Sequence, residues 1–221
     1  MVFDMDGTLT PVHSVWQYIH EHLGTWESHG LRSLSAFLAG RITYREFADR
    51  DVAAWRGVPR ARLEEAVAAI PLRPGVPELV NTLRERGCRL AVLSSGLDLL
   101  VRRVADPLGF DLCICNELGF SDGVIDGRVT INVGWDGKPG QLPTICRRFG
   151  VMPGEVAMVG DGSGDAAVFP LVGLGVAFNA APEVEALAHV TVRHEDARSL
   201  LPVLLPRLAG EGEWTDAVAV R

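Results

Sequence analysis

Basic residues are too few in this chain to form a broad positive surface. Lysine and arginine number 21 against 28 aspartates and glutamates, so the formal net charge is −7 at pH 7. Nucleic acids and anionic membranes attract proteins through surfaces of the opposite sign. We therefore expect neither as a partner, and any anionic ligand must be held by a local site.

Cysteine is also scarce, and its four positions are too scattered for a disulfide scaffold. They are Cys88, Cys113, Cys115 and Cys146. A zinc site needs about four convergent ligands, and no second pair matches the two cysteines that flank Ile114. We expect Cys113 and Cys115 to be buried structural thiols.

The sequence has no apolar run long enough to cross a bilayer. Its longest stretch without a charged residue, 166–182, falls short of the required ~20 residues and is interrupted by proline and glycine. The chain opens directly on an apolar strand, without the basic segment of a signal peptide. We expect no transmembrane helix and a cytoplasmic location. That first strand is unusually short, which indicates that the natural chain begins upstream.

The chain has an ordinary globular composition and a length that suits one core with an insert. Of its 221 residues, 48% are hydrophobic and 22% are charged. Apolar runs that lead into small-residue turns alternate with amphipathic segments, a pattern that predicts a mostly parallel sheet covered by helices on both faces. The predicted strands are 2–3, 89–93, 156–159 and 175–178, and the clearest helices are 78–86 and 141–149.

Residues 11–73 differ from the rest because they show helical spacing without a convincing strand. We predict a helical cap there, inserted into a core made of residues 1–10 and 74–205. A small β-hairpin is expected within 117–133, where Asp-Gly turn signals separate two apolar runs. Residues 206–221 contain few large apolar side chains, and we expect a loosely ordered C-terminal tail.

Carboxylates follow two of the predicted strands. Asp4 and Asp6 follow the first strand, while Asp161 and Asp165 follow the strand 156–159. The carboxyl ends of parallel strands meet at one edge of a sheet, where clustered carboxylates repel one another unless a cation is bound. Oxygen ligands in a partly hydrated site suit magnesium, so the sequence predicts a Mg²⁺ site.

Two further residues supply groups that bind phosphate. Ser94 follows the strand 89–93, and Lys138 precedes the helix expected from Gln141. Phosphoryl transfer needs donors and positive charge around the non-transferred oxygens. Either residue alone is typical of a turn or a solvated surface, and their order along the chain is the stronger signal.

This order resembles the four motifs of the haloacid dehalogenase superfamily of phosphatases, in its phosphoserine-phosphatase-like branch. The motifs are DMDGTLT at 4–10, the serine after LAVL, Lys138, and GDGSGD at 160–165. The resemblance implies an α/β fold, a Rossmann-like doubly wound, mostly parallel sheet with an inserted four-helix cap, and Mg²⁺-dependent hydrolysis of phosphate esters.

The resemblance also implies a role for each motif residue. Asp4 would be the nucleophile that forms an aspartyl phosphate, and Asp6 the general acid and base. Asp4, the backbone carbonyl of Asp6, and Asp161 would hold Mg²⁺, supported by Asp165. The phosphate would be bound by Ser94 and Lys138.

The cap departs from the phosphoserine phosphatases at two positions. His13 stands where they have a glutamate that binds the substrate amine, and Asp51 stands near their carboxylate-binding arginine. An aspartate does not pair with a substrate carboxylate, so we expect phosphoserine to be a poor substrate. We predict that His13, Tyr44 and Asp51 determine specificity, with aromatic neighbours at Trp16, Phe47 and Trp55, although core packing is the simpler explanation for aromatics at helical spacing. His20, His22 and His29 are expected on the surface.

The first hypothesis is therefore a magnesium-dependent phosphomonoesterase for a small phosphorylated metabolite, such as a sugar, an amino-alcohol or a secondary-metabolite intermediate. The alternatives within the family are a phosphotransferase and a phosphoserine phosphatase. A different class, a phospho-aspartate receiver or a phosphate-binding module, also uses acidic residues and a lysine. A receiver domain is shorter, however, and has no use for an insert at 11–73.

Overall fold

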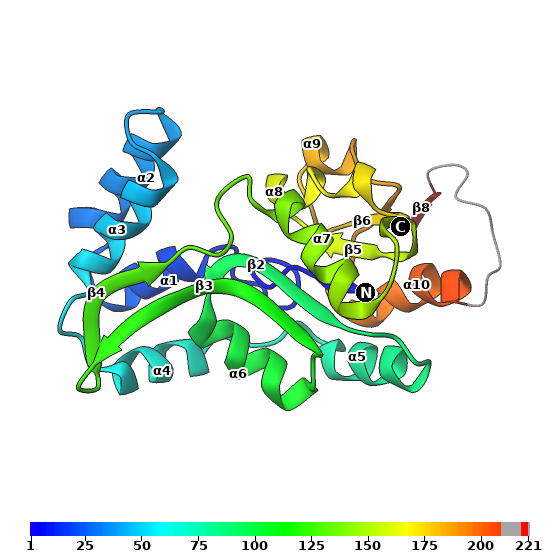
Figure 1. Cartoon of the computed structure of the whole chain (residues 1–221), viewed down its shortest axis with the longest axis horizontal. Helices are drawn as coiled ribbons and strands as arrows, with labels where there is room; N and C mark the ends of the chain where they lie inside the picture. The colour runs from blue at the N-terminus through cyan, green and yellow to red at the C-terminus, as the bar shows by residue number, and fades with distance from the viewer. Residues whose placement is uncertain (209–217, 221) are drawn as a thin grey trace.

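A mostly parallel sheet forms the centre of the molecule (Figure 1). The computed structural model describes residues 1–208 and 218–220. Its strands are β1 (Val2–Phe3), β2 (Ala91–Leu97), β3 (Leu112–Ser121), β4 (Val124–Thr130), β5 (Ala157–Gly160), β6 (Leu174–Phe178), β7 (Val190–Val192) and β8 (Val218–Val220). Their order in the sheet is β4-β3-β2-β1-β5-β6-β7-β8, and only the β3–β4 pair is antiparallel. The strand order reverses at β1, so the crevice for a ligand opens at its carboxyl end.

Helices separate these strands along the chain. The α-helices are α1 (Val15–His22), α2 (Leu31–Leu38), α3 (Tyr44–Ala54), α4 (Arg60–Ala68), α5 (Val76–Glu85), α6 (Asp98–Leu108), α7 (Lys138–Phe149), α8 (Ser163–Ala166), α9 (Pro182–Glu185) and α10 (Leu201–Leu208). Shorter segments are the π-helical turn η1 (Trp26–Gly30) and the 3₁₀ turns η2 (Pro153–Glu155), η3 (Phe169–Leu171) and η4 (Ala197–Leu200).

The helices cover both faces of the sheet, with α5 and α6 on one side and α7 and α8 on the other (Figure 1). Side chains alternate along each strand, so neighbouring residues enter different apolar clusters. Val2 belongs to the cluster that includes Leu142 of α7, while Phe3 belongs to the cluster that includes Leu79 of α5. The parallel sheet and its two helical layers confirm the predicted α/β class.

The hairpin predicted within 117–133 is confirmed, with Glu117 opposite Thr130. β3 pairs with β2 through its first half and with β4 through its second half. The connecting turn places Asp122 and Gly123 at φ values of 51° and 77°, which glycine and aspartate tolerate best. The long β3 therefore joins the central sheet to the hairpin.

Two expectations about single segments need correction. Cys115 is buried, but Cys113 is exposed, because the apolar cluster on their shared face includes Cys115 and stops short of Cys113. At the C-terminus, α10 extends to Leu208, three residues into the predicted tail, and β8, which lies within that tail, pairs with β7, with Val218 opposite Val190. Residues 209–217 and 221 of that tail lie outside the described residues.

The insert consists of α1–α4 and η1, and residues 11–73, all of them described, contain no strand. It lies against the hairpin through backbone hydrogen bonds: Gly57 donates to the carbonyl of Ile125, and Ile125 donates to that of Val58. The division into a core of 1–10 and 74–205 and a cap of 11–73 stays a prediction about separate units. Among the described residues, no helix has both the length and the apolarity needed to span a membrane.

Candidate active site

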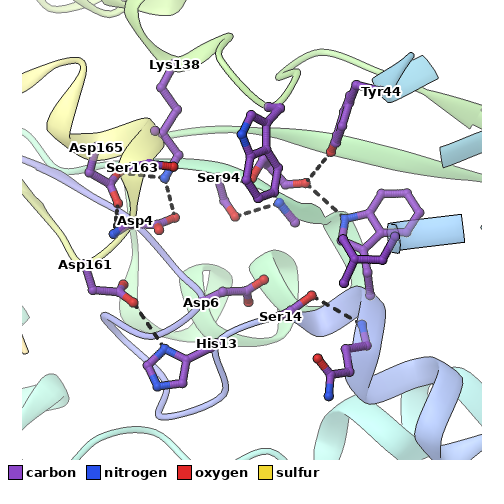
Figure 2. A pocket seen from close by; sticks show the side chains of 18 of the residues that line it. Asp4, Asp6, His13, Ser14, Tyr44, Ser94, Lys138, Asp161, Ser163 and Asp165 are labelled. Carbon is purple, nitrogen blue, oxygen red and sulfur yellow. Dashed lines mark hydrogen bonds and ion pairs between the residues drawn. The ribbon is translucent and has the colours of Figure 1, made fainter. Parts of the chain in front are cut away.

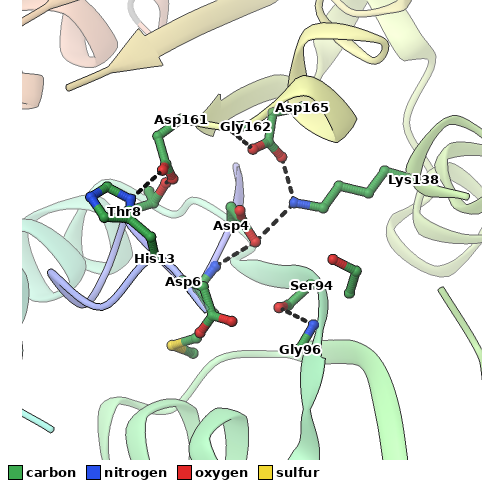
Figure 3. A network of polar contacts seen from close by, with 12 residues as sticks. Asp4, Asp6, Thr8, His13, Ser94, Gly96, Lys138, Asp161, Gly162 and Asp165 are labelled. Atoms are coloured by element: carbon green, nitrogen blue, oxygen red, sulfur yellow. Dashed lines mark hydrogen bonds and ion pairs between the residues drawn. The ribbon is translucent and has the colours of Figure 1, made fainter. Parts of the chain in front are cut away.

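Adjacent strand ends bring the acidic motifs together (Figure 3). Asp4 directly follows β1 and Asp161 directly follows β5. The two strands are parallel neighbours, and the Asp4 amide donates to the carbonyl of Val159 at 2.9 Å. One oxygen from each of Asp4, Asp161 and Asp165 lies within 4.8 Å of the others. The structure therefore brings Asp4 of the first motif together with Asp161 and Asp165 of the last motif.

Lys138 lies buried between two of these carboxylates. Its Nζ is 2.8 Å from Asp4 Oδ1 and 2.6 Å from Asp165 Oδ1. Burial lowers the pKa of Lys138, but the adjacent carboxylates outweigh burial and hold this pKa above its ordinary value. Burial, with the nearby Asp165, raises the pKa of Asp4 well above normal. Helix α7 begins at Lys138 itself rather than three residues later, so its first turn delivers the ammonium to the site.

The two carboxylate oxygens of Asp6 differ in their hydrogen bonding. Its Oδ2 accepts a hydrogen bond from the Val15 amide at 3.0 Å, at the start of α1. Its Oδ1 is buried and has no hydrogen-bond partner among the described residues. Burial raises the pKa of Asp6 to about 6, a value suited to a group that gives and takes a proton near neutral pH.

Asp161 is oriented by two residues of the first loop. Thr8 Oγ1 donates to its Oδ1 at 2.7 Å, and His13 Nδ1 lies 3.2 Å from its Oδ2. Gly7 makes this approach possible, because its φ is 77° and a Cβ there would overlap the Asp161 carboxylate. Thr8 was not singled out from the sequence, although its place in the motif DMDGTLT was a usable signal. His13, predicted as a specificity residue, contacts the acidic cluster.

Ser94 lies inside β2, which continues four residues beyond the predicted strand end. Its side chain is buried, and its Oγ accepts a hydrogen bond from the Gly96 amide at 2.9 Å. This contact leaves the hydroxyl proton available for an anion. Ser94 borders the same cavity as Asp4 and Lys138, so the two predicted phosphate-binding residues share a cavity with the predicted nucleophile.

The cluster has the chemistry of a magnesium site. Its donors are carboxylate oxygens, which Mg²⁺ prefers, and Asp161 is held in place by Thr8 and His13. The raised pKa values of Asp4 and Asp161 arise chiefly from burial, with repulsion from Asp165 contributing to both. A hard dication would relieve this repulsion. The residues therefore fit a hard divalent cation.

A cavity of about 250 Å³ connects the acidic cluster to the cap (Figure 2). His13, Tyr44 and Asp51, the predicted cap residues, all border it. Its aromatic wall consists of Trp16, Trp26, Tyr44, Phe47 and Trp135. Trp55 is fully buried outside this wall, as expected for core packing.

Asn116 is a structural support for this cavity that sequence reasoning missed. Its Nδ2 donates to the carbonyls of Ser95 and Val133 and lies 3.3 Å from the Tyr44 hydroxyl. Its Oδ1 accepts from the amides of Asn132 and Val133. The sequence signal for this support is an asparagine within a strand-like run of apolar residues. An amide buried in such a strand needs a complete set of hydrogen-bond partners.

The expectation that His20 lies on the surface is wrong. His20 has 0% exposure and lies between Trp55 and Asp51, another buried residue of the cap. Other cap elements cover the side of α1 that carries His20 as well as the apolar face of the helix, so His20 is buried. His22 and His29 are exposed, as predicted.

Comparison with known proteins gives a consistent result. The family of haloacid dehalogenase-like hydrolases matches residues 1–169. A phosphoserine phosphatase of Idiomarina loihiensis is 29% identical over 205 residues, which cover 92% of each protein. Another, from Archaeoglobus fulgidus, is 31% identical over 92% of this chain, which spans only 59% of that protein.

Solved structures agree with these relatives. The fold matches a phospho-aspartyl intermediate analogue of phosphoserine phosphatase with a TM-score of 0.79 and 27% identity, covering 91% of this chain and 96% of that one. A substrate-bound phosphoserine phosphatase matches equally well, with a TM-score of 0.79. These relatives favour the phosphoserine phosphatase alternative over the first hypothesis of another metabolite. The chain belongs to the haloacid dehalogenase-like hydrolases and is a phosphatase of their phosphoserine-phosphatase-like branch.

Proposed function

We propose that this phosphatase hydrolyses the phosphomonoester of a small metabolite through a phosphorylated Asp4, with Mg²⁺ bound, and that L-phosphoserine is the first candidate substrate. The position of Asp4 carries the proposal: its carboxylate lies 2.8 Å from a buried lysine and within the oxygen cluster. The names of the relatives support phosphoserine as the substrate.

The bound ion would be held by Asp4 and Asp161, with Asp165 in support, and by the backbone carbonyl of Asp6. When bound, Mg²⁺ offsets the charge of the carboxylates and of the phosphate, so that an anionic nucleophile and an anionic substrate meet. Lys138 and Ser94 provide the remaining donors for the phosphoryl oxygens.

In the first half-reaction, a carboxylate oxygen of Asp4 attacks phosphorus in line with the leaving alcohol. The new Asp4 O–P bond forms as the P–O bond to the alcohol breaks. Asp6 donates its proton from Oδ1 to the departing oxygen, because that oxygen atom has no other partner while Oδ2 is held by Val15.

In the second half-reaction, Asp6 is ionised and accepts a proton from a water molecule. The water oxygen attacks phosphorus, the bond to Asp4 breaks, and inorganic phosphate leaves. The pKa of Asp6, raised by burial to about 6, makes both protonation states accessible near neutral pH.

The experiment is a hydrolysis assay with p-nitrophenyl phosphate and L-phosphoserine, with and without Mg²⁺. We expect turnover that requires the ion and is abolished in Asp4→Asn. Asp122→Asn, on the exposed hairpin turn, is the matched control and should behave as the wild type. Activity without a divalent cation, or an active Asp4→Asn enzyme, contradicts the mechanism.

One observation favours a second candidate, the phosphate ester of an amino-alcohol without a carboxylate. Among the described residues that border the cavity, only Lys138 and His13 carry basic side chains, and both contact acidic residues of the cluster. No arginine is present there to bind the carboxylate of phosphoserine. Comparing kcat/KM for L-phosphoserine and phosphoethanolamine separates the two candidates.

A further inference from the structure

The cap contains a buried polar group that the proposed mechanism does not use. Asp51, on α3, has 1% exposure and borders the cavity. Its Oδ2 lies 3.4 Å from Nε2 of His20, a fully buried residue of α1. Its Oδ1 is buried and has no hydrogen-bond partner among the residues that the structure describes. A buried acceptor without a donor is destabilising, so this carboxylate is a candidate for binding a ligand group.

His20 directs one ring nitrogen toward Trp55 and the other toward Asp51. The indole Nε1 of Trp55, which can only donate, points to His20 Nδ1 at 3.2 Å. The Thr25 hydroxyl, which can also donate, lies 2.7 Å from the same nitrogen. Nδ1 is therefore an acceptor, and the ring proton lies on Nε2, facing Asp51. Nε2 faces Asp51 Oδ2 at 3.4 Å without forming a hydrogen bond, so no group of the described cap fully satisfies the Asp51 carboxylate, which borders the cavity.

The surroundings of Asp51 suit a cation. Trp16 and Phe47 border the same cavity, and their ring centroids are 6.0 Å apart. Aromatic faces attract ammonium groups, most strongly where water is excluded. Figure 2 shows Tyr44 on the opposite side of the cavity from Lys138 and the acidic cluster. The cavity thus has a phosphate end and an aromatic, acidic cap end.

We propose that the cap end is an ammonium subsite, in which the carboxylate of Asp51 accepts a hydrogen bond from the protonated amine of the leaving group. The subsite rests on the proposed function, because the leaving group is that of the phosphomonoester cleaved at Asp4. His20 is a positioning residue that orients Asp51. The substrate class is the phosphate ester of a small primary amino-alcohol.

A matched pair of substrates tests the subsite. Phosphoethanolamine and n-propyl phosphate have the same number of heavy atoms and differ by an ammonium in place of a methyl group. We expect the wild-type enzyme to favour phosphoethanolamine in kcat/KM. Asp51→Asn should reduce this preference about 10- to 100-fold, as the loss of a charge-assisted hydrogen bond predicts. Because the ratio is compared between variants, the intrinsic reactivity of each ester cancels.

The control variant is Asp49→Asn, two residues away on α3, where the side chain is 45% exposed. It should keep the wild-type ratio. His20→Leu should lower the ratio in the same direction as Asp51→Asn while p-nitrophenyl phosphate is still hydrolysed, whereas a merely structural role would reduce all three activities together.

Each outcome has a distinct meaning. Equal kcat/KM for the two esters in the wild-type enzyme overturns the subsite even if Asp51→Asn fails to fold, and so does an unchanged ratio in Asp51→Asn. Hydrolysis of p-nitrophenyl phosphate in those cases leaves the proposed function standing. Absence of hydrolysis of any phosphate ester with Mg²⁺ overturns the proposed function itself and the subsite with it.

Discussion

Replacing Asp6 by asparagine removes a proton and leaves most of the site geometry in place. The asparagine Oδ1 can accept the Val15 amide that now binds Asp6 Oδ2 at 3.0 Å, so the start of α1 is preserved. The group facing the leaving oxygen becomes an amide, which is not an acid. The perturbation therefore affects the general acid step specifically.

The size of the effect depends on the leaving group. General acid catalysis typically contributes about 10²- to 10⁴-fold, equivalent to about 3–5 kcal/mol of activation free energy. An alkoxide needs this proton, whereas p-nitrophenolate is stable without it. We expect Asp6→Asn to lower kcat/KM for an alkyl phosphate by the full factor and for p-nitrophenyl phosphate by less than about tenfold.

The assay compares kcat/KM, because this constant reports steps only up to the first irreversible one, release of the alcohol. Phosphate release is measured for phosphoethanolamine and for p-nitrophenyl phosphate at saturating Mg²⁺. The kcat for both esters should fall, since Asp6 also accepts the proton of the attacking water. Equal losses of kcat/KM for the two esters refute the acid role of Asp6.

Three other changes test the construction of the site. Gly7→Ala should abolish activity and lower the thermal midpoint, because a Cβ would overlap Asp161; an unchanged midpoint in calorimetry would argue against the observed loop. Lys138→Met should lower the free energy of unfolding by about 3–5 kcal/mol in urea titrations with EDTA, since it leaves the buried carboxylates of Asp4 and Asp165 without their cation. Mg²⁺ should raise the thermal midpoint of the wild-type protein through binding to the native state, and this shift should shrink in Asp161→Asn; equal shifts would place the ion elsewhere.

The convergence of the acidic motif residues was predictable, because it depends on local chain features. Asp4 and Asp161 each follow a short apolar strand, and parallel strands deliver their carboxyl ends to one edge. Lys138 was recognisable by its order in the chain, yet its place between two carboxylates depends on the approach of α7. The α/β class followed from the same alternation of strands and helices.

The cap was less predictable, since its important contacts join residues of different helices. Composition and helical spacing indicated a helical insert but placed His20 on the surface. The packing of α1 against α3 buries it beside Asp51, and Trp55 then determines which ring nitrogen carries the proton. Asn116 similarly acquires its role from five hydrogen bonds with four residues that fold around it.

The sequence by itself determined the class of fold, the order of the motifs and the residues available for phosphoryl chemistry, because these depend on residue type and on short-range periodicity. Only the tertiary structure decided which oxygens remain unpaired at Asp6 and Asp51 and what borders the cavity between them. Hydrogen-bond saturation depends on distance and direction between segments far apart in the chain, and those are fixed only when the helices pack.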